Sequence, residues 1–277
     1  MEELKAKENF DHDGHILRSY DWDSTEGWKD RLADKIIPII KELYLDLVGL
    51  KKNLAEDGLL DDTDIKKFID DSLAATIPDA SPKLPKQFRP RRADFAELLA
   101  LICLEELHQT IIPVKNLFYR ELTGAVGRGV DILGYELHGT DLALIICEIK
   151  GSIDRDSPPS VVETGDESMK SQLYSYVSDR KKTQNRILNI HKKSTGEHKK
   201  ILAKIAALWW KNNNVLKAVV CPFLVRKADL YKSTDFGSFN SNPDHFHPAK
   251  VRFLIVCIND DIGQLSDMLY DKASNES

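Results

Sequence analysis

Hydrophobic residues recur at helical spacing early in the chain. Trp28, Leu32 and Ile36 lie one turn apart, and this pattern predicts a helix over 24–37. Pro38 follows directly, and proline lacks the backbone N–H that a helix interior needs. We therefore expect Pro38 to break or kink this helix, or to open the next one at its first turn.

A second apolar stripe predicts a helix over 64–75. The stretch 77–90 then carries four prolines, and proline disfavours helix at the residue before it. This stretch is expected to be an extended linker. The sequence therefore predicts a mostly helical N-terminal region with its linker over 1–90 and a second domain over 91–277.

The pattern changes after this linker, because β-branched apolar runs and glycines alternate with amphipathic stretches. The order predicts an α/β (α+β) fold, in which helices flank a mixed central sheet. The expected elements are a helix over 94–107, strands over 118–122, 130–137 and 142–149, helices over 167–190 and 199–211, strands over 215–225 and 251–258, and a closing helix over 261–270.

Composition narrows the class of protein. The chain has 277 residues, of which 42% are hydrophobic and 30% charged, so it is neither disordered nor collagen-like. No apolar run approaches the roughly 18 residues that a membrane span needs. Residues 1–10 are too charged for a secretory signal. Four cysteines stand singly in apolar runs without a CxxC pair, which indicates buried thiols in a reducing cytoplasm rather than zinc ligands or disulfides.

Charge is distributed unevenly along the chain. The net charge of −5 alone argues weakly against nucleic-acid binding. Residues 167–232, however, contain 15 Lys and Arg against 4 Asp and Glu, a net of +11, whereas residues 1–90 carry −6. Such a basic block can attract a polyanion even on an acidic protein, and the alternative is a solvated helix face. The glycines at 124, 127 and 129 lack a following GK[ST], so they predict a hairpin turn and no ATP binding by this chain.

The segment 142–150, LALIICEIK, carries the most chemical information. Its unbroken apolar run predicts a central strand buried on both faces, and it ends in Glu148 and Lys150. Side chains alternate along a strand, so these two share a face and Ile149 points away. Charged groups are rarely buried without a partner or a metal. The two residues therefore form either a structural ion pair or a functional site.

Asp131 adds a second carboxylate in the preceding predicted strand. Neighbouring antiparallel strands could bring it beside Glu148, although the register is open at this stage. Two carboxylates repel each other unless a cation bridges them, and Mg²⁺ prefers such oxygen ligands. Lys150 could then activate a water or stabilise charge that develops on a phosphate. The alternative for Asp131 is a polar residue near a turn.

The order Asp131, then Glu148-Ile-Lys150, resembles the D…(D/E)xK signature of the PD-(D/E)xK nuclease superfamily. The order of elements is also similar to that family's restriction-endonuclease-like core. This resemblance implies that Asp131 and Glu148 bind Mg²⁺, or Mn²⁺, together with the carbonyl of Ile149. It also implies that Lys150 is the catalytic lysine.

Two further positions match features of that superfamily. Glu97 corresponds to a carboxylate on the first helix that completes the metal site in many members. Its alternative role is a capping box, with Asp94 as the N-cap of the helix. Gln172 and Tyr176 resemble the Q-x-x-x-Y motif of the RecB-like branch. These two lie one helical turn apart, and their alternative role is packing in an amphipathic helix.

The central segments ADFAELLAL, GRGVDILGYE and CEIKGS resemble the nuclease subunit of Hachiman antiphage defence systems. The resemblance implies a Mg²⁺-dependent DNA endonuclease of low sequence specificity, restrained by a helicase subunit until damaged DNA is sensed. The alternative is a non-catalytic interaction or nucleic-acid-binding module with a degenerate nuclease fold. The basic block supplies the residues expected to contact DNA phosphates, namely Arg180, Lys181, Lys182, Arg186, Lys192, Lys193, Lys199 and Lys200.

Overall fold

The structure, a computed structural model, describes residues 2–57, 60–77, 90–115, 130–139 and 141–275. The expected strand over 118–122, the glycine turn over 124–129 and most of the expected linker lie outside the described residues. The chain divides into two compact units. A sheet unit comprises 1–23, 100–116 and 127–259, and a helical unit comprises 24–99, 117–126 and 260–277.

The sheet unit is built on six strands of the described residues, in the order β1-β2-β6-β5-β4-β3. The outer pairs β1–β2 and β3–β4 are antiparallel, and the three inner pairings are parallel. The predicted mixed sheet flanked by helices is confirmed. The strands are β1 Leu4–His12, β2 His15–Trp22, β3 Ile132–His138, β4 Asp141–Ser152, β5 Leu216–Lys227 and β6 Lys250–Ile258.

The hairpin of β1 and β2 corrects the expectation that residues 1–90 are mostly helical. Asp13 and Gly14 turn the chain, both with positive φ, as the tight hairpin turn requires. The inward-facing positions of β2 include His15 and Ser19 as well as Leu17. The sequence of β2 therefore lacks the alternation of apolar and polar residues that predicts a strand, because polar side chains occupy some of its buried positions.

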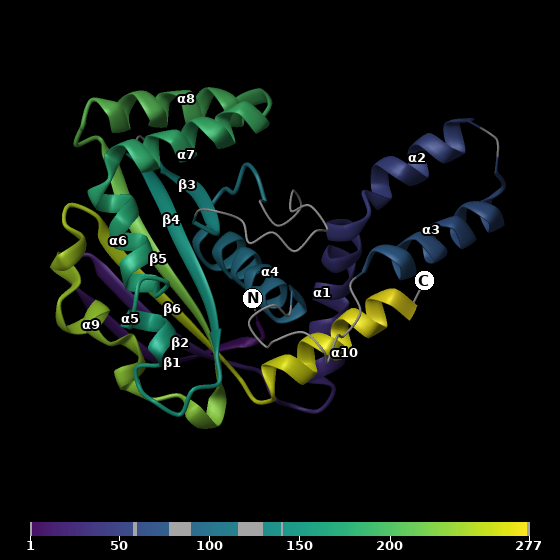
Figure 1. Ribbon diagram of the computed structural model, residues 1–277, viewed down its shortest axis with the longest axis horizontal. Helices are drawn as coiled ribbons and strands as arrows, with labels where there is room; N and C mark the ends of the chain where they lie inside the picture. Colours follow the sequence, from purple (N-terminus) through teal and green to yellow (C-terminus); the bar gives the residue numbers. More distant parts are fainter. Residues whose placement is uncertain (1, 58–59, 78–89, 116–129, 140, 276–277) are drawn as a thin grey trace. The chain divides into compact units, whose positions relative to one another are not determined.

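Helices cover one face of this sheet beside a continuous apolar core. Figure 1 shows α6 (Met169–Ser178) along β4 and β5, with α7 (Arg180–Lys193) and α8 (Gly196–Trp210) packed side by side. A single helix over 167–190 was expected, but the chain forms two. Asp179 separates them, since its carboxylate accepts the N–H of Lys182 at 2.9 Å and so caps α7.

Short elements connect these helices and strands. They are α5 Ser160–Glu163, α9 Ser238–Ser241 and the 3₁₀ turns Ala228–Leu230, Ser233–Phe236 and Pro243–Phe246. The four cysteines are all buried, as the sequence predicted, and each is a free thiol. Among the described residues, no helix is both long enough and apolar enough to cross a membrane.

The helical unit combines N-terminal helices with the last helix of the chain. Its helices are α1 Trp28–Tyr44, α2 Leu47–Asp57, α3 Asp62–Thr76, the first half of α4 Pro90–His108, and α10 Ile262–Asn275. Within this unit α10 packs against α1, and the expected domain boundary at 90/91 stays a prediction. Pro38 lies inside α1, so it does not end the helix there.

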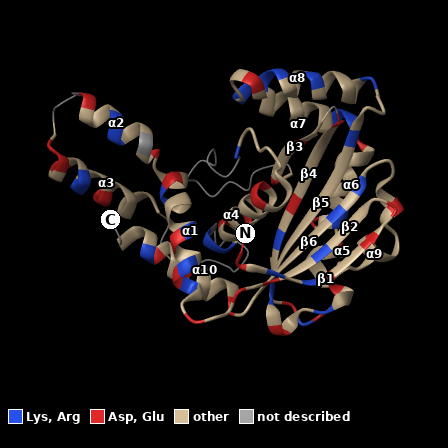
Figure 2. Ribbon diagram, turned by 180° about the vertical axis from the view of Figure 1, so that it is seen from behind, with Lys and Arg blue, Asp and Glu red and all other residues tan. Residues whose placement is uncertain are grey.

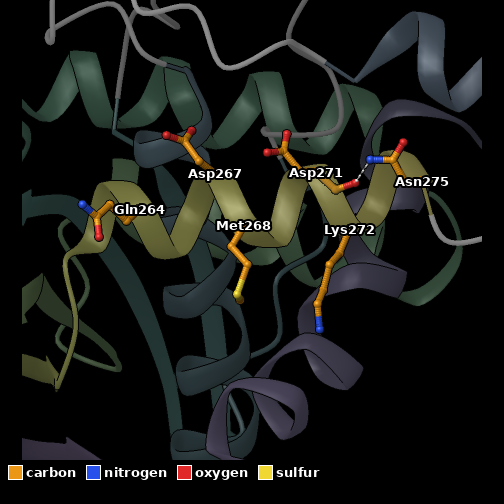
Figure 3. Close-up of a pocket in the computed structure, with 6 residues that line it drawn as sticks. All are labelled: Gln264, Asp267, Met268, Asp271, Lys272 and Asn275. Atoms are coloured by element: carbon orange, nitrogen blue, oxygen red, sulfur yellow. Dashed lines mark hydrogen bonds between the residues drawn. The ribbon is translucent and has the colours of Figure 1, made fainter.

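Polar contacts tie α10 to the other helices of this unit. Arg91 Nη1 donates to Asp271 Oδ1 at 2.8 Å, and Lys272 Nζ donates to Asp30 at 3.1 Å. Figure 3 shows the residues of α10 that line a pocket, where Asn275 donates to the carbonyl of Asp271. The contacts to Arg91 and Asp30 help to hold α10 against the other helices of this unit.

Candidate functional site

The register of β3 and β4 aligns the two carboxylates that the sequence singled out. Ile132 pairs with Cys147, so continuing the antiparallel register by one residue places Asp131 opposite Glu148. The Oδ2 atom of Asp131 accepts the backbone N–H of Ile149 at 2.7 Å. Asp131 and Glu148 are therefore brought together at one end of the strand pair.

Glu148 is a buried carboxyl group, and one of its oxygens has no hydrogen-bond partner among the described residues. Its side chain is 3% exposed, and Oε1 lies 2.8 Å from Nζ of Lys150. The other oxygen, Oε2, is buried and has no hydrogen-bond partner among the described residues. Burial and the neighbouring Asp131 raise the pKa of Glu148 to about 8, against the opposing effect of Lys150. A buried carboxylate with an unpaired oxygen favours a positive ligand.

Lys150 completes this group of charges at the site. Burial alone would lower the pKa of Lys150, but Glu148 and then Asp131 raise it, so the ammonium stays charged. Its side chain is 25% exposed, whereas Glu148 beside it is almost fully covered. Lys150 is thus the member of this pair that solvent reaches more readily.

These residues fit the oxygen-ligand chemistry of a hard divalent cation. Two opposed carboxyl groups, one with a buried oxygen that no described residue contacts by a hydrogen bond, provide donors that Mg²⁺ or Mn²⁺ prefers. The carbonyl of Ile149 lies between Glu148 and Lys150 in the chain, as the resemblance requires. Within the described part of the chain, no group of three or more His, Cys, Asp or Glu side chains is arranged as a metal site. The candidate site therefore rests on two carboxylates and a backbone oxygen.

Glu97 is buried on α4, within the helical unit. Its alternative role in a capping box is wrong. The helix already begins at Pro90, so Asp94 lies inside it and cannot be its N-cap. The carboxylate of Asp94 instead accepts the hydroxyl of Tyr44 at 2.8 Å. A metal-binding role for Glu97 stays a prediction.

Gln172 forms a hydrogen bond with Glu167, which was not predicted as a site residue from the sequence. Its Nε2 atom donates to Oε2 of Glu167 at 2.7 Å. Glu167 is close enough to Glu148 and Lys150 to contribute to the raised pKa of each. A sequence signal was available, since Glu167 lies just before the N-cap of α6 and five residues before Gln172.

The eight basic residues expected to contact DNA separate into two groups. Five are exposed on α7 and α8, and Figure 2 shows basic positions along α8. The other three are only partly exposed: Arg180 lies 4.6 Å from the Trp209 ring, and Lys182 donates to Ser175 at 2.6 Å. Arg186 donates to a backbone carbonyl. The exposed group is Lys181, Lys192, Lys193, Lys199 and Lys200.

A second buried charge cluster lies on the opposite face of the sheet, and the sequence analysis did not identify it. Glu136 on β3 accepts both terminal nitrogens of Arg252 on β6 and the hydroxyl of Thr110. Burial by itself would raise the pKa of Glu136. The hydrogen bonds and the charge of Arg252 outweigh this effect and, with smaller contributions from other donors, lower the pKa to about 2. Because both charges are paired, we assign this cluster to stability.

Comparison with protein families gives one result that spans nearly the whole chain. The HamA family model matches residues 4–273. No curated protein and no solved structure matches the chain.

Proposed function

The chain belongs to the HamA family and so to the Hachiman antiphage defence systems, and from this premise we propose that it is their metal-dependent nuclease. It would hydrolyse DNA phosphodiester bonds with little sequence specificity. The observation that carries the proposal is the alignment of Asp131 with Glu148, whose buried Oε2 has no partner among the described residues while Lys150 contacts Oε1.

Each residue of the group has a role in this proposal. Asp131, Glu148 and the Ile149 carbonyl would hold a divalent cation, which when bound supplies a Lewis acid and lowers the pKa of a water. Lys150, fixed at 2.8 Å from Glu148, would donate to a phosphate oxygen as negative charge develops. The Gln172–Glu167 pair is a further candidate at this centre, and a metal-binding role for Glu97 stays a prediction.

DNA would be held chiefly through its phosphates. The exposed lysines of α7 and α8 provide the positive charge, and phosphate contacts carry no sequence information. A sequence-blind nuclease would damage its own genome unless it were restrained. We therefore include a helicase subunit of the same system as the restraining partner in the proposal.

Plasmid nicking by the purified protein tests this function. Mg²⁺ or Mn²⁺ should support cleavage, and EDTA should abolish it until metal is restored. Lys150→Ala should lower the cleavage rate at least about a hundredfold while the circular dichroism spectrum is unchanged. Lys217→Ala is the matched control, since Lys217 also lies on a strand and pairs with an acid, Asp141, away from the site.

Two results would contradict the proposal. Cleavage that persists in excess chelator would remove the metal from the mechanism. Undiminished cleavage by folded Lys150→Ala protein would remove the assigned site. If the wild-type protein binds DNA but does not cleave it under any metal, the non-catalytic module is the better description, and Glu148–Lys150 is a structural ion pair.

A further inference from the structure

Val130, the residue before Asp131, is held at both of its backbone polar groups. The backbone N–H of Val130 donates to Oη of Tyr176 at 2.7 Å, and its carbonyl accepts Nη2 of Arg186 at 2.9 Å. Val130 itself is 1% exposed. Side chains from α6 and α7 thus replace the strand pairing that this residue, just before β3, does not have.

The two side chains that hold this peptide are themselves restrained. The carbonyl of Tyr176 accepts the hydroxyl of Thr183 on α7, and Tyr176 is 2% exposed. The ammonium of Lys182 lies 4.2 Å from the centre of the Tyr176 ring and also donates to Ser175. The position of Tyr176 is therefore determined by α7 as well as by its own helix.

We propose that Tyr176 and Arg186 are positioning residues that set the place of Asp131 opposite Glu148. This inference rests on the proposed function and deepens it. A displacement of about 1 Å in a reacting group can cost a hundredfold in rate. Holding the backbone of Val130 at its N–H and its carbonyl would keep Asp131 in place and so support the rate. The guanidinium of Arg186 faces a backbone carbonyl, so Arg186 acts through Asp131 rather than by contacting a DNA phosphate.

Two substitutions distinguish positioning of Asp131 from direct contact with DNA. Arg186→Ala and Tyr176→Phe should lower kcat about ten- to hundredfold and raise the Mn²⁺ concentration that gives half-maximal rate. The dissociation constant for DNA, measured without metal, should stay within about twofold. Arg186→Lys should recover part of the rate, because an ammonium can also donate to the Val130 carbonyl. Lys192→Ala should show the opposite pattern, with weaker DNA binding and unchanged metal dependence.

Matched controls remove comparable hydrogen bonds elsewhere in the sheet unit. Tyr231→Phe loses the hydroxyl contact to Glu8 at 2.6 Å, and Arg18→Ala loses a two-point contact to Asp11. Neither substitution should change kcat or the metal requirement. If both controls reduce kcat as much as the test variants do, the effect is general destabilisation and the inference is wrong.

Hydrogen–deuterium exchange gives a readout that does not depend on nuclease activity. In Arg186→Ala and Tyr176→Phe, exchange should increase in peptides that contain Val130 and Asp131 as interior residues, and it should not increase in β5 or β6. Unchanged exchange there, or weaker DNA binding with unchanged metal dependence, would overturn the inference. A wild-type protein that neither cleaves DNA nor binds Mn²⁺ would refute the proposed function, while the exchange result would still decide whether this contact orders Asp131. If Arg186→Ala does not fold, Tyr176→Phe and Arg186→Lys carry the same test.

Discussion

At the scale of single residues, Glu148 shows how one buried carboxylate can be prepared for a cation. One oxygen contacts Lys150 at 2.8 Å and the other is buried without a partner among the described residues. Burial and Asp131 together raise its pKa to about 8, so near neutral pH most of this carboxyl carries a proton. A metal that binds here has to displace that proton.

Metal affinity should therefore depend steeply on pH. Below pH 8 the apparent Mn²⁺ dissociation constant should fall about tenfold for each unit of rising pH, and above pH 8 it should level off, because Glu148 is then already ionised. Calorimetric titration of wild-type protein between pH 6 and 9 measures this slope. Glu148→Gln is the control and should bind weakly with little slope. A wild-type affinity that is constant over this range would exclude Glu148 as the titrating ligand.

At the scale of elements, β3 depends on contacts beyond its partner strand. It is one of the two edge strands of the sheet among the described residues, and besides its pairing with β4 it has an isolated bridge between Tyr135 and Ile111. Glu136 links it across the face of the sheet to Arg252 on β6, with Thr110 as a further donor. This buried pair joins two strands that are not neighbours in the sheet.

Removing one partner of this pair should be costly. Glu136→Ala leaves the charge of Arg252 buried and unpaired, so urea unfolding should show a loss of about 3–5 kcal/mol. The double variant Glu136→Leu with Arg252→Met should recover much of that stability, since it removes both charges. The folded-state pKa of about 2 is below the usual value, so this contribution is present above about pH 4.5 and is lost as pH falls toward 2. A Glu136→Ala protein of wild-type stability would contradict this role.

At the scale of the whole molecule, charge is separated along the chain. The block over 167–232 has a net charge of +11, and the structure exposes five of its predicted DNA-binding lysines on α7 and α8. The family places the protein in a defence system that includes partner proteins. A partner that covers these helices and releases them on damaged DNA would provide a trigger that the basic block alone does not have.

Co-expression with the neighbouring gene product of the defence locus tests the partner. The two proteins should elute as one complex in size-exclusion chromatography with light scattering, through an interface larger than about 1,000 Å². The complex should cleave intact plasmid more slowly than the isolated chain does. Lys199→Glu with Lys200→Glu should weaken both DNA binding and this complex if the partner covers α8. A monomer that ignores the partner and is harmless when expressed in active form would argue decisively against restraint.

The local pattern of apolar and polar residues was sufficient to predict most elements of the sheet unit. It also identified the candidate site residues on β4. The apolar run of β4 and its ending in Glu148 and Lys150 follow from side-chain alternation, which is a property of neighbouring residues. The break between α6 and α7 was missed because a single capping residue, Asp179, interrupts an otherwise continuous helical composition. The β1–β2 hairpin was missed because its buried positions are partly polar.

The sequence by itself determined which residue types could perform chemistry here and on which face of a strand they project. Tertiary structure alone decided that Asp131 lies opposite Glu148. It also decided that Tyr176 and Arg186 hold the backbone of Val130, and that Glu136 pairs with Arg252. These contacts join segments from about 17 to more than 100 residues apart. Periodicity encodes the face of an element, but pairing between distant segments depends on how the whole core packs.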